Sequence, residues 1–264
     1  MIPYPTIDPV LLSWGPIQIR WYGVAYVMGI MMAMAYLKPI LIQKLSLSQD
    51  QRSALVLYVM MGIMLGGRLG YIIFYDLSYY LYHPSQWIAV WNGGMSYHGG
   101  GIGAVAALGL FARKHQVSYR SLLDILGLGA PIGLFLGRIA NFINAELYGR
   151  VTTVPWGMVF PNAGSIPRHP SQLYEAVGEG LFLFLILHYV RLKVPLKPGQ
   201  LFGLHWVGYG GGRFIIEFFR EPDRHLGLIW GPFTMGQLLC AVMITGGLAI
   251  MRYGAASQKG RACK

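Results

Sequence analysis

The sequence predicts an all-α integral membrane protein, a bundle of seven transmembrane helices with the amino terminus outside, the carboxyl terminus in the cytoplasm and an outer loop region over the site. Of its 264 residues, 55% are hydrophobic and only 12% are charged, and the mean hydropathy is +0.47. Apolar runs recur along the chain, several near the roughly 20 residues that a spanning helix needs. Basic residues gather in alternate gaps between these runs. The alternation over about ten residues that is typical of a spanning β-barrel is missing.

The apolar runs set the order of the expected helices. They lie at 21–37, 54–75, 99–112, 122–136, 173–190, 201–219 and 232–251. The first begins after a segment with no basic region and no small-residue cleavage site, so we expect an integral helix and not a removed signal peptide. The whole chain, 1–264, is expected to form one polytopic membrane domain, with 144–170 as an outer loop segment within it.

Net charge is +11, which in a soluble protein would suggest nucleic acid. Here all seven lysines lie in the gaps after the first, third, fifth and seventh runs. By the positive-inside rule those gaps are cytoplasmic, so the charge describes topology and excludes a nucleic-acid partner. Cys240 and Cys263 show no metal or disulfide spacing, and no nucleotide motif occurs. We therefore expect neither a metal nor another cofactor.

Eight cations are not explained by topology, and all are arginine. They are Arg20, Arg68, Arg138, Arg150, Arg168, Arg213, Arg220 and Arg224. A planar, always-charged fork binds phosphate or carboxylate bidentately, which lysine does not. Arg68, Arg138 and Arg213 each follow a glycine in the outer third of a span, where ionisable groups usually face a polar cavity or a partner. These positions predict an outward-opening pocket ringed by arginines.

Small residues predict where the helices approach closely. Gly62, Gly66 and Gly70 are spaced i, i+4, i+8, and Gly129 and Gly133 follow the same rule. Such stripes let helices pack tightly in lipid.

Other polar residues lie near these arginines. Arg213, Glu217 and Arg220 are spaced i, i+4, i+7 and share one helix face. They form either a structural ion pair or an oriented site in which the glutamate positions an arginine for a ligand. Arg138 and Asn141, at i, i+3, aim a guanidinium and an amide at the same volume.

Two further stretches remain open between structural and functional roles. His98 lies among glycines in WNGGMSYHGGGIGA, where its imidazole is either a base for a thiol or hydroxyl or a hydrogen-bonded structural group. In RHPSQLYE, residues 168–175, Pro170 and Ser171 are good helix-start residues, and capping is the favoured interpretation for Glu175. His169 and Gln172 stay possible site residues.

An arginine-lined outward cavity suits two classes of protein. One is an enzyme, and the other is a transporter or channel for an anionic lipid or metabolite. Secondary transporters usually show two related halves, and seven spans do not divide in that way. A structural membrane module has little use for Arg, Asn and Glu facing a pocket. The residues alone leave enzyme and transporter open.

The stretch GRIANFINAELYG, residues 137–149, resembles the signature of the bacterial prolipoprotein diacylglyceryl transferases. Further landmarks agree in family order, from the first span to the sixth. They are WYG at 21–23, GGRLGY at 66–71, GGMSYHGG at 93–100, RHPSQLYE at 168–175 and GGRFIIEFFREPD at 211–223.

The resemblance implies an activity: transfer of the diacylglyceryl group of phosphatidylglycerol to the lipobox cysteine thiol in the signal peptide of a preprolipoprotein. A thioether forms and glycerol 1-phosphate leaves, as the first step of lipoprotein maturation. The protein is expected in the bacterial inner membrane, surrounded by membrane lipids, with its active site toward the periplasm. No cofactor is implied.

The resemblance also implies site residues. Arg138 and Arg213 match essential arginines, and His98 is the best candidate base, so these three are the expected catalytic residues. The expected substrate-binding residues are Tyr22, Arg68, Asn141, Glu146, Gly149, Tyr209, Glu217 and Arg220.

Overall fold

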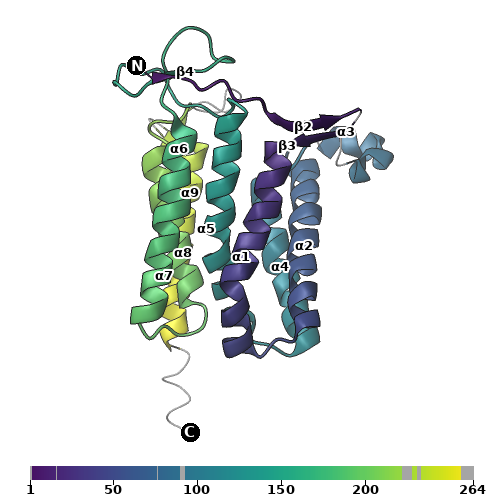
Figure 1. Cartoon of the computed structure of the whole chain (residues 1–264). Coiled ribbons are helices and arrows are strands. Elements are labelled where there is room, and N and C mark those ends of the chain that lie inside the picture. Colours follow the sequence, from purple (N-terminus) through teal and green to yellow (C-terminus); the bar gives the residue numbers. More distant parts are fainter. Residues whose placement is uncertain are drawn as a thin grey trace. The chain divides into compact units, whose positions relative to one another are not determined.

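The computed structural model describes residues 2–15, 17–75, 77–89, 93–221, 228–230 and 233–256. The chain forms two compact units, one of Met1–Leu37 with Asp124–Lys264 and one of Lys38–Leu123. Both units are mostly helical (Figure 1). The single membrane domain expected from the sequence stays a prediction.

A helix occupies each of the seven apolar runs, which confirms the mostly helical fold. The helices are α1 (Trp21–Leu45), α2 (Gln49–Tyr75), α4 (Tyr97–His115), α5 (Tyr119–Ile143), α6 (Ser171–Glu175), α7 (Leu183–Lys193), α8 (Gln200–Ile216) and α9 (Met235–Ala256). A π-helical stretch, η3 (Ala176–Phe182), joins α6 to α7 and makes them one continuous helix. Two short elements, α3 (Leu77–Tyr82) and the 3₁₀-helix η1 (Pro84–Ile88), lie between α2 and α4.

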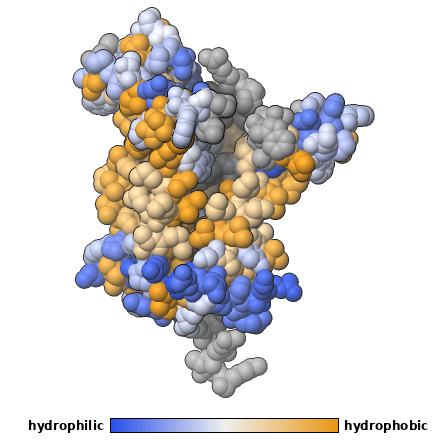
Figure 2. Space-filling model, turned by 45° about the vertical axis from the view of Figure 1, so that its right-hand side comes forward, coloured by the Kyte–Doolittle hydropathy of each residue, from blue (hydrophilic) through white to orange (hydrophobic). Residues whose placement is uncertain are grey.

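Within the described part of the chain, five helices are long and apolar enough to cross a membrane. They are α1, α2, α5, the continuous α6–η3–α7 helix and α9. Large apolar side chains such as Met31, Leu57 and Phe182 are exposed on their sides. In Figure 2, hydrophobic side chains cover the sides of the helices and hydrophilic side chains gather toward their ends. This distribution suits helices surrounded by lipid.

Short strands precede α1 and also occur between α5 and α6 and between α8 and α9. Strand β1 (Ile2–Pro3) pairs in parallel with β4 (Met158–Val159). Strands β2 (Val10–Trp14) and β3 (Ile17–Arg20) form an antiparallel hairpin, as do β5 (Leu228–Trp230) and β6 (Phe233–Thr234).

The β1–β4 pairing brings the first residues of the chain to the end of α5. The hydroxyl of Tyr4 donates to the carbonyl oxygens of Phe142 at 2.6 Å and Ile143 at 3.0 Å. The last carbonyls of a helix lack partners inside the helix, so the tyrosine caps them. Its ring packs on Phe142 and Phe160, in a small core with Met158. The 144–170 segment is thereby packed against the end of α5.

A carboxylate joins the start of α5 to the start of α8. Asp124 accepts hydrogen bonds from the backbone nitrogens of Gly199 at 2.8 Å and Phe202 at 2.9 Å. It therefore serves the unpaired N–H groups at the start of α8 as a capping residue would. The two helices that carry Arg138 and Arg213 are fixed to each other at this point.

In the unit of residues 38–123, glycines form the contact between α2 and α4. A Cβ added at Gly103 would collide with the carbonyl of Gly62 and lie 2.9 Å from the Cα of Gly66. A Cβ added at Gly70 would lie 2.8 Å from the Cα of Gly99. The predicted role of the 62–66–70 stripe in close helix packing is confirmed.

Replacing Gly103 by Val is expected to force α2 and α4 apart, because the backbones leave no room for a side chain. Overpacking of this kind costs about 1–3 kcal/mol or more. Thermal unfolding in detergent measures the loss. The matched control is Gly101→Val on the same helix, where an added Cβ meets nothing within 4 Å. Equal midpoints for the two variants would contradict the packing interpretation.

Candidate functional site

Arg138 of α5 and Arg213 of α8 meet at one carboxylate. Arg138 Nε lies 2.6 Å from Glu175 Oε2, and Arg213 Nη1 lies 3.1 Å from Glu175 Oε1. Arg220, just beyond α8, places its Nη1 3.1 Å from the same Oε1. Glu175 is the last residue of α6 and is fully buried. One carboxylate thus holds three guanidinium groups from different parts of the chain.

A second glutamate lies one turn further along the same helix, in η3. Glu179 Oε1 is 3.7 Å from Arg213 Nη1, and its Oε2 is 3.9 Å from Arg138 Nη2. The side chain is fully buried, and neither oxygen accepts a hydrogen bond from the described residues. A Cβ added at Gly180 would lie 2.6 Å from Phe135 Cβ, so η3 packs directly on α5. π-helical turns of this kind frequently occur at functional sites.

Glu217 completes the group of acids. Its Oε2 is 2.9 Å from Arg213 Nη2, and its Oε1 accepts a hydrogen bond of 2.9 Å from the hydroxyl of Thr234. Thr234 directly precedes α9, where helix N–H groups favour a negative charge. The helical spacing of Arg213 and Glu217 therefore produces the ion pair that the sequence indicates. Glu175 and Glu217 therefore bind the two terminal nitrogens of Arg213.

The arginine–glutamate cluster, defined as Arg138, Arg213 and Arg220 with Glu175, Glu179 and Glu217, has equal numbers of positive and negative groups. Buried ions are costly unless they are paired, and here the ions of each sign surround one another. The three arginine side chains keep 13–16% of their surface exposed, whereas Glu175 and Glu179 keep 1% or less. The arginines are therefore the more accessible members of the cluster.

The turn after α5 supports Arg138. Asn141 Nδ2 donates to Glu146 Oε1 at 2.7 Å, while Asn141 Oδ1 lies 3.5 Å from Arg138 Nη1. Ala145 and Leu147, on either side of Glu146, have φ of 52° and 57°. Side chains with a Cβ rarely adopt this left-handed conformation, and such strain clusters at functional sites. The signature stretch is thus a strained turn that links Glu146 to Arg138 through Asn141.

The RHPSQLYE stretch holds this turn. Gln172 Nε2 donates to the carbonyl oxygen of Glu146 at 2.6 Å, and Ser171 Oγ donates to that of Leu147 at 3.0 Å. Both side chains are completely buried. Gln172, left open by the sequence, acts as a brace for the strained turn.

Gly149 lies where three backbone segments meet. Its nitrogen donates to the His169 carbonyl at 2.8 Å, and it forms an antiparallel bridge with Arg220. A Cβ here would lie 2.8 Å from His169 Cβ, so only glycine fits. Arg150 Nε donates to the carbonyl oxygen of Arg220 at 2.8 Å. These contacts fix the backbone that carries the third arginine of the cluster.

Two predicted tyrosines lie in the same unit. Tyr209 is buried one turn before Arg213 on α8 and interacts electrostatically with Arg138 and Arg213. Tyr22 packs its ring 5.1 Å from that of Tyr26, which itself interacts electrostatically with Arg138. Tyr22 therefore adjoins the cluster through Tyr26.

Arg68 belongs to the unit of residues 38–123 and is only 4% exposed. Its Nε donates to Trp87 O at 3.0 Å and its Nη2 to Gln86 O at 2.6 Å. Its Nη1 donates to the carbonyl oxygens of Gly93 and Gly94. The guanidinium is surrounded by backbone carbonyls of the segment that precedes α4.

His98 lies in the first turn of α4, in the same unit, and is exposed. Ser96 caps this helix, since its side chain accepts a hydrogen bond from Gly99 N. The backbone nitrogen of Ser96 donates to Gly67 O at 2.9 Å. The start of α4 is therefore fixed to α2 next to Arg68.

Sequence reasoning missed the two central acids. Glu179 lies within one of the apolar runs. The capping interpretation of Glu175 is wrong, because this residue ends α6 and contacts three arginines. A signal existed: two acids inside an otherwise apolar span are expensive and usually functional.

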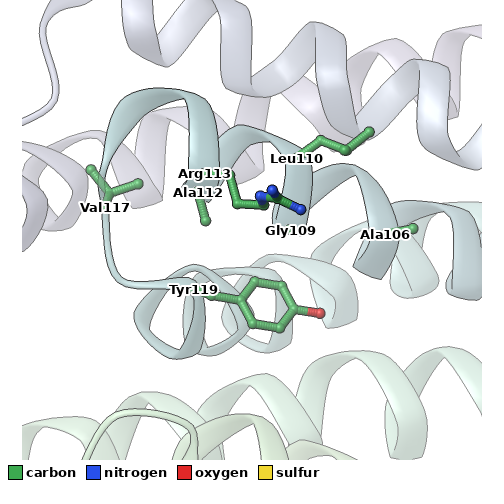
Figure 3. A pocket seen from close by; sticks show the side chains of 7 residues that line it. All are labelled: Ala106, Gly109, Leu110, Ala112, Arg113, Val117 and Tyr119. Atoms are coloured by element: carbon green, nitrogen blue, oxygen red, sulfur yellow. The ribbon is translucent and has the colours of Figure 1, made fainter.

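In the unit of residues 38–123, a surface groove of about 470 Å³ lies on α4 and the start of α5 (Figure 3). Its lining is mostly apolar and includes the side chains of Arg113 and Tyr119. None of the predicted site residues lines it. Among the described residues, no three His, Cys, Asp or Glu side chains are grouped to hold a metal ion.

Comparison with known proteins gives consistent matches. The family model described as prolipoprotein diacylglyceryl transferase matches residues 9–253. A phosphatidylglycerol–prolipoprotein diacylglyceryl transferase of Methylocella silvestris is 49% identical, covering 96% of each chain. The protein with the same description from Geobacter sulfurreducens is 50% identical over 94% of this chain and 95% of its own. One from Nitrobacter hamburgensis is 50% identical over 95% of this chain and 89% of its own.

The resemblance read from the motifs is therefore confirmed along nearly the whole sequence, and the protein crosses the membrane several times. The chain belongs to the prolipoprotein diacylglyceryl transferase family.

Proposed function

We propose that this chain transfers the diacylglyceryl group of phosphatidylglycerol to the lipobox cysteine thiol of a preprolipoprotein. A thioether forms and glycerol 1-phosphate is released. The observation that carries the proposal is the arginine–glutamate cluster, in which buried carboxylates orient three partly exposed arginines at the end of apolar helices. Guanidinium forks match phosphate oxygens in geometry and charge.

The proposed topology has seven spans in the bacterial inner membrane, with α4 and α8 added to the five long apolar helices. Lys44, Arg113 and Lys193 lie in the last turns of α1, α4 and α7, at the ends assigned to the cytoplasm. Arg138 and Arg213 lie near the ends of helices that run the other way, which supports a site toward the periplasm.

The chemistry is a displacement at the glyceryl carbon. A sulfur–carbon bond forms, the carbon–oxygen bond breaks, and its electron pair goes to the phosphate oxygen. Negative charge therefore grows on the leaving phosphate, and prepositioned donors in a site of low dielectric stabilise it. Arg138 and Arg213 take this role, oriented by Asn141, Glu175 and Glu217.

Four further assignments follow from position. Arg220 is the third donor, and the Gly149 bridge fixes its backbone. Tyr22 contacts the headgroup beside Arg138. Tyr209, one turn before Arg213 on α8, is assigned to the same binding site. Glu146 orients Arg138 through the amide of Asn141.

His98 is assigned as the base that accepts the thiol proton. A neutral imidazole suits this task, because a thiol needs only modest help to become the nucleophilic thiolate. Arg68 is assigned a positioning role toward His98, since it binds the carbonyls of the segment leading into α4. This role differs from the substrate contact that the sequence suggests for Arg68.

The direct test is transfer of labelled glyceryl from phosphatidylglycerol to a lipobox peptide by the purified protein in detergent. A matched peptide with Ser in place of the Cys should receive no label. Labelling of both peptides, or of neither, would overturn the proposed function.

Replacing Arg213 by Lys keeps the positive charge but loses the fork, so turnover should fall at least about 100-fold. The peptide assay measures this. The matched control is Arg120→Lys, an exposed arginine at the start of α5 that should keep normal activity. Near-normal turnover by the Arg213 variant would refute the bidentate role.

Replacing His98 by Gln should lower turnover and flatten its rise with pH between about pH 5 and 8, because only the neutral imidazole accepts a proton. Initial rates across this range measure the effect. If the variant keeps the pH profile of the wild type, another group or water takes the proton.

Replacing Arg68 by Lys should lower kcat about 10- to 100-fold through misplacement of the α4 start, with KM for the lipid unchanged. In a His98→Gln background the same change should have little further effect, because both act on one step. Arg52→Lys is the control on α2. Independent, multiplicative losses would show that Arg68 acts without His98.

A further inference from the structure

The charge balance of the arginine–glutamate cluster has a consequence for a lipid anion. Three guanidinium groups face three carboxylates, so the formal charge of the cluster is zero when every acid is ionised. A phosphodiester brings one further negative charge into a site where unpaired charge is costly. One of the acids must therefore move away or gain a proton.

The three acids are held to different degrees. Glu175 has contacts of 2.6–3.1 Å to three arginines. Glu217 has Arg213 at 2.9 Å and the hydroxyl of Thr234 at 2.9 Å. Glu179 has only the two long contacts of 3.7 and 3.9 Å and accepts no hydrogen bond from the described residues. Glu179 is the least stabilised anion of the cluster.

The side chain of Glu179 cannot move out of the cluster. Its side chain is fully buried, and its helix is fixed on α5 by the contact of Gly180 with Phe135. A carboxylate cannot reach water without shifting η3. A proton, in contrast, removes the charge with no movement of the backbone.

We propose that Glu179 is a charge-compensating residue that takes up one proton from solution when the phosphodiester headgroup binds. Once Glu179 is neutral, the cluster has a net charge of one positive unit, which balances the single negative charge of the lipid. The inference rests on the proposed function and specifies its substrate: a headgroup with a single negative charge.

The charged and titratable groups that face the site of Glu179 belong to α5, to α8 and the chain beyond it, and to α9. Arg138 of α5 and Arg213 of α8, with Arg220 beyond it, stay charged at all accessible pH values. Glu175 is held by short contacts. Tyr209 of α8 faces the same arginines, and Cys240 of α9 interacts electrostatically with Glu179.

The test is calorimetric titration of the full-length protein in detergent with dioctanoyl phosphatidylglycerol, in two buffers of different ionisation enthalpy at pH 8. The difference in heat gives the protons taken up per lipid. Wild type should take up close to one, and its dissociation constant should rise up to about tenfold per pH unit, because the bound state holds one more proton. No uptake by wild type would overturn the proposal.

Variants locate the proton. Glu179→Gln, which imitates the neutral acid, should take up none and bind with an affinity independent of pH. Glu221→Gln, which removes the acid paired with Arg168, and Cys240→Ser should keep the uptake. Uptake retained by Glu179→Gln, or lost in either control, would assign the proton to another group.

A second readout does not depend on the variants folding. Infrared difference spectra of the wild type should gain the band of a protonated carboxylic acid on lipid addition, and its absence counts against the proposal. The peptide assay separates the two proposals: wild type that transfers label but takes up no proton retains the proposed function and loses this one.

Discussion

The carboxylate of Glu175 is the contact on which the site depends. It receives Arg138 from α5, Arg213 from α8 and Arg220 from the chain beyond α8. Removing one member of a buried ion pair is strongly destabilising, because the remaining charge is left without compensation. Here one acid contacts arginines from three segments of chain. Their relative positions, and so the spacing of the guanidinium groups, are set by a residue that has almost no exposed surface.

Other residues of the site hold the arginines and glutamates in this arrangement. The turn at Ala145–Leu147 is strained, and Ser171 and Gln172 hold it by bonding its carbonyls. Thr234 fixes Glu217, which fixes Arg213 in turn. Donors held in advance need no reorganisation when charge develops on a substrate. Rigidity of the supporting contacts is therefore part of the chemistry.

The sequence predicts most of the helical fold because long apolar runs and lysine-bearing gaps are local signals. It also predicts contacts set by helix geometry, such as Arg213 with Glu217 and Arg138 with Asn141. It does not predict that Glu175 lies among arginines, since its partners come from other helices. The pairing of β1 with β4 escapes for the same reason, because it joins residues 2–3 to residues 158–159.

The pairing of β1 with β4, together with the cap that Tyr4 places on α5, bears on biosynthesis. Residues 2–4 leave the ribosome long before their partners at 142–143 and 158–159. Contacts of such long sequence separation form slowly, and they form only after the intervening segments have inserted. Residues 2–4 therefore stay unpaired during this interval, and the end of α5 is capped only when Tyr4 reaches it.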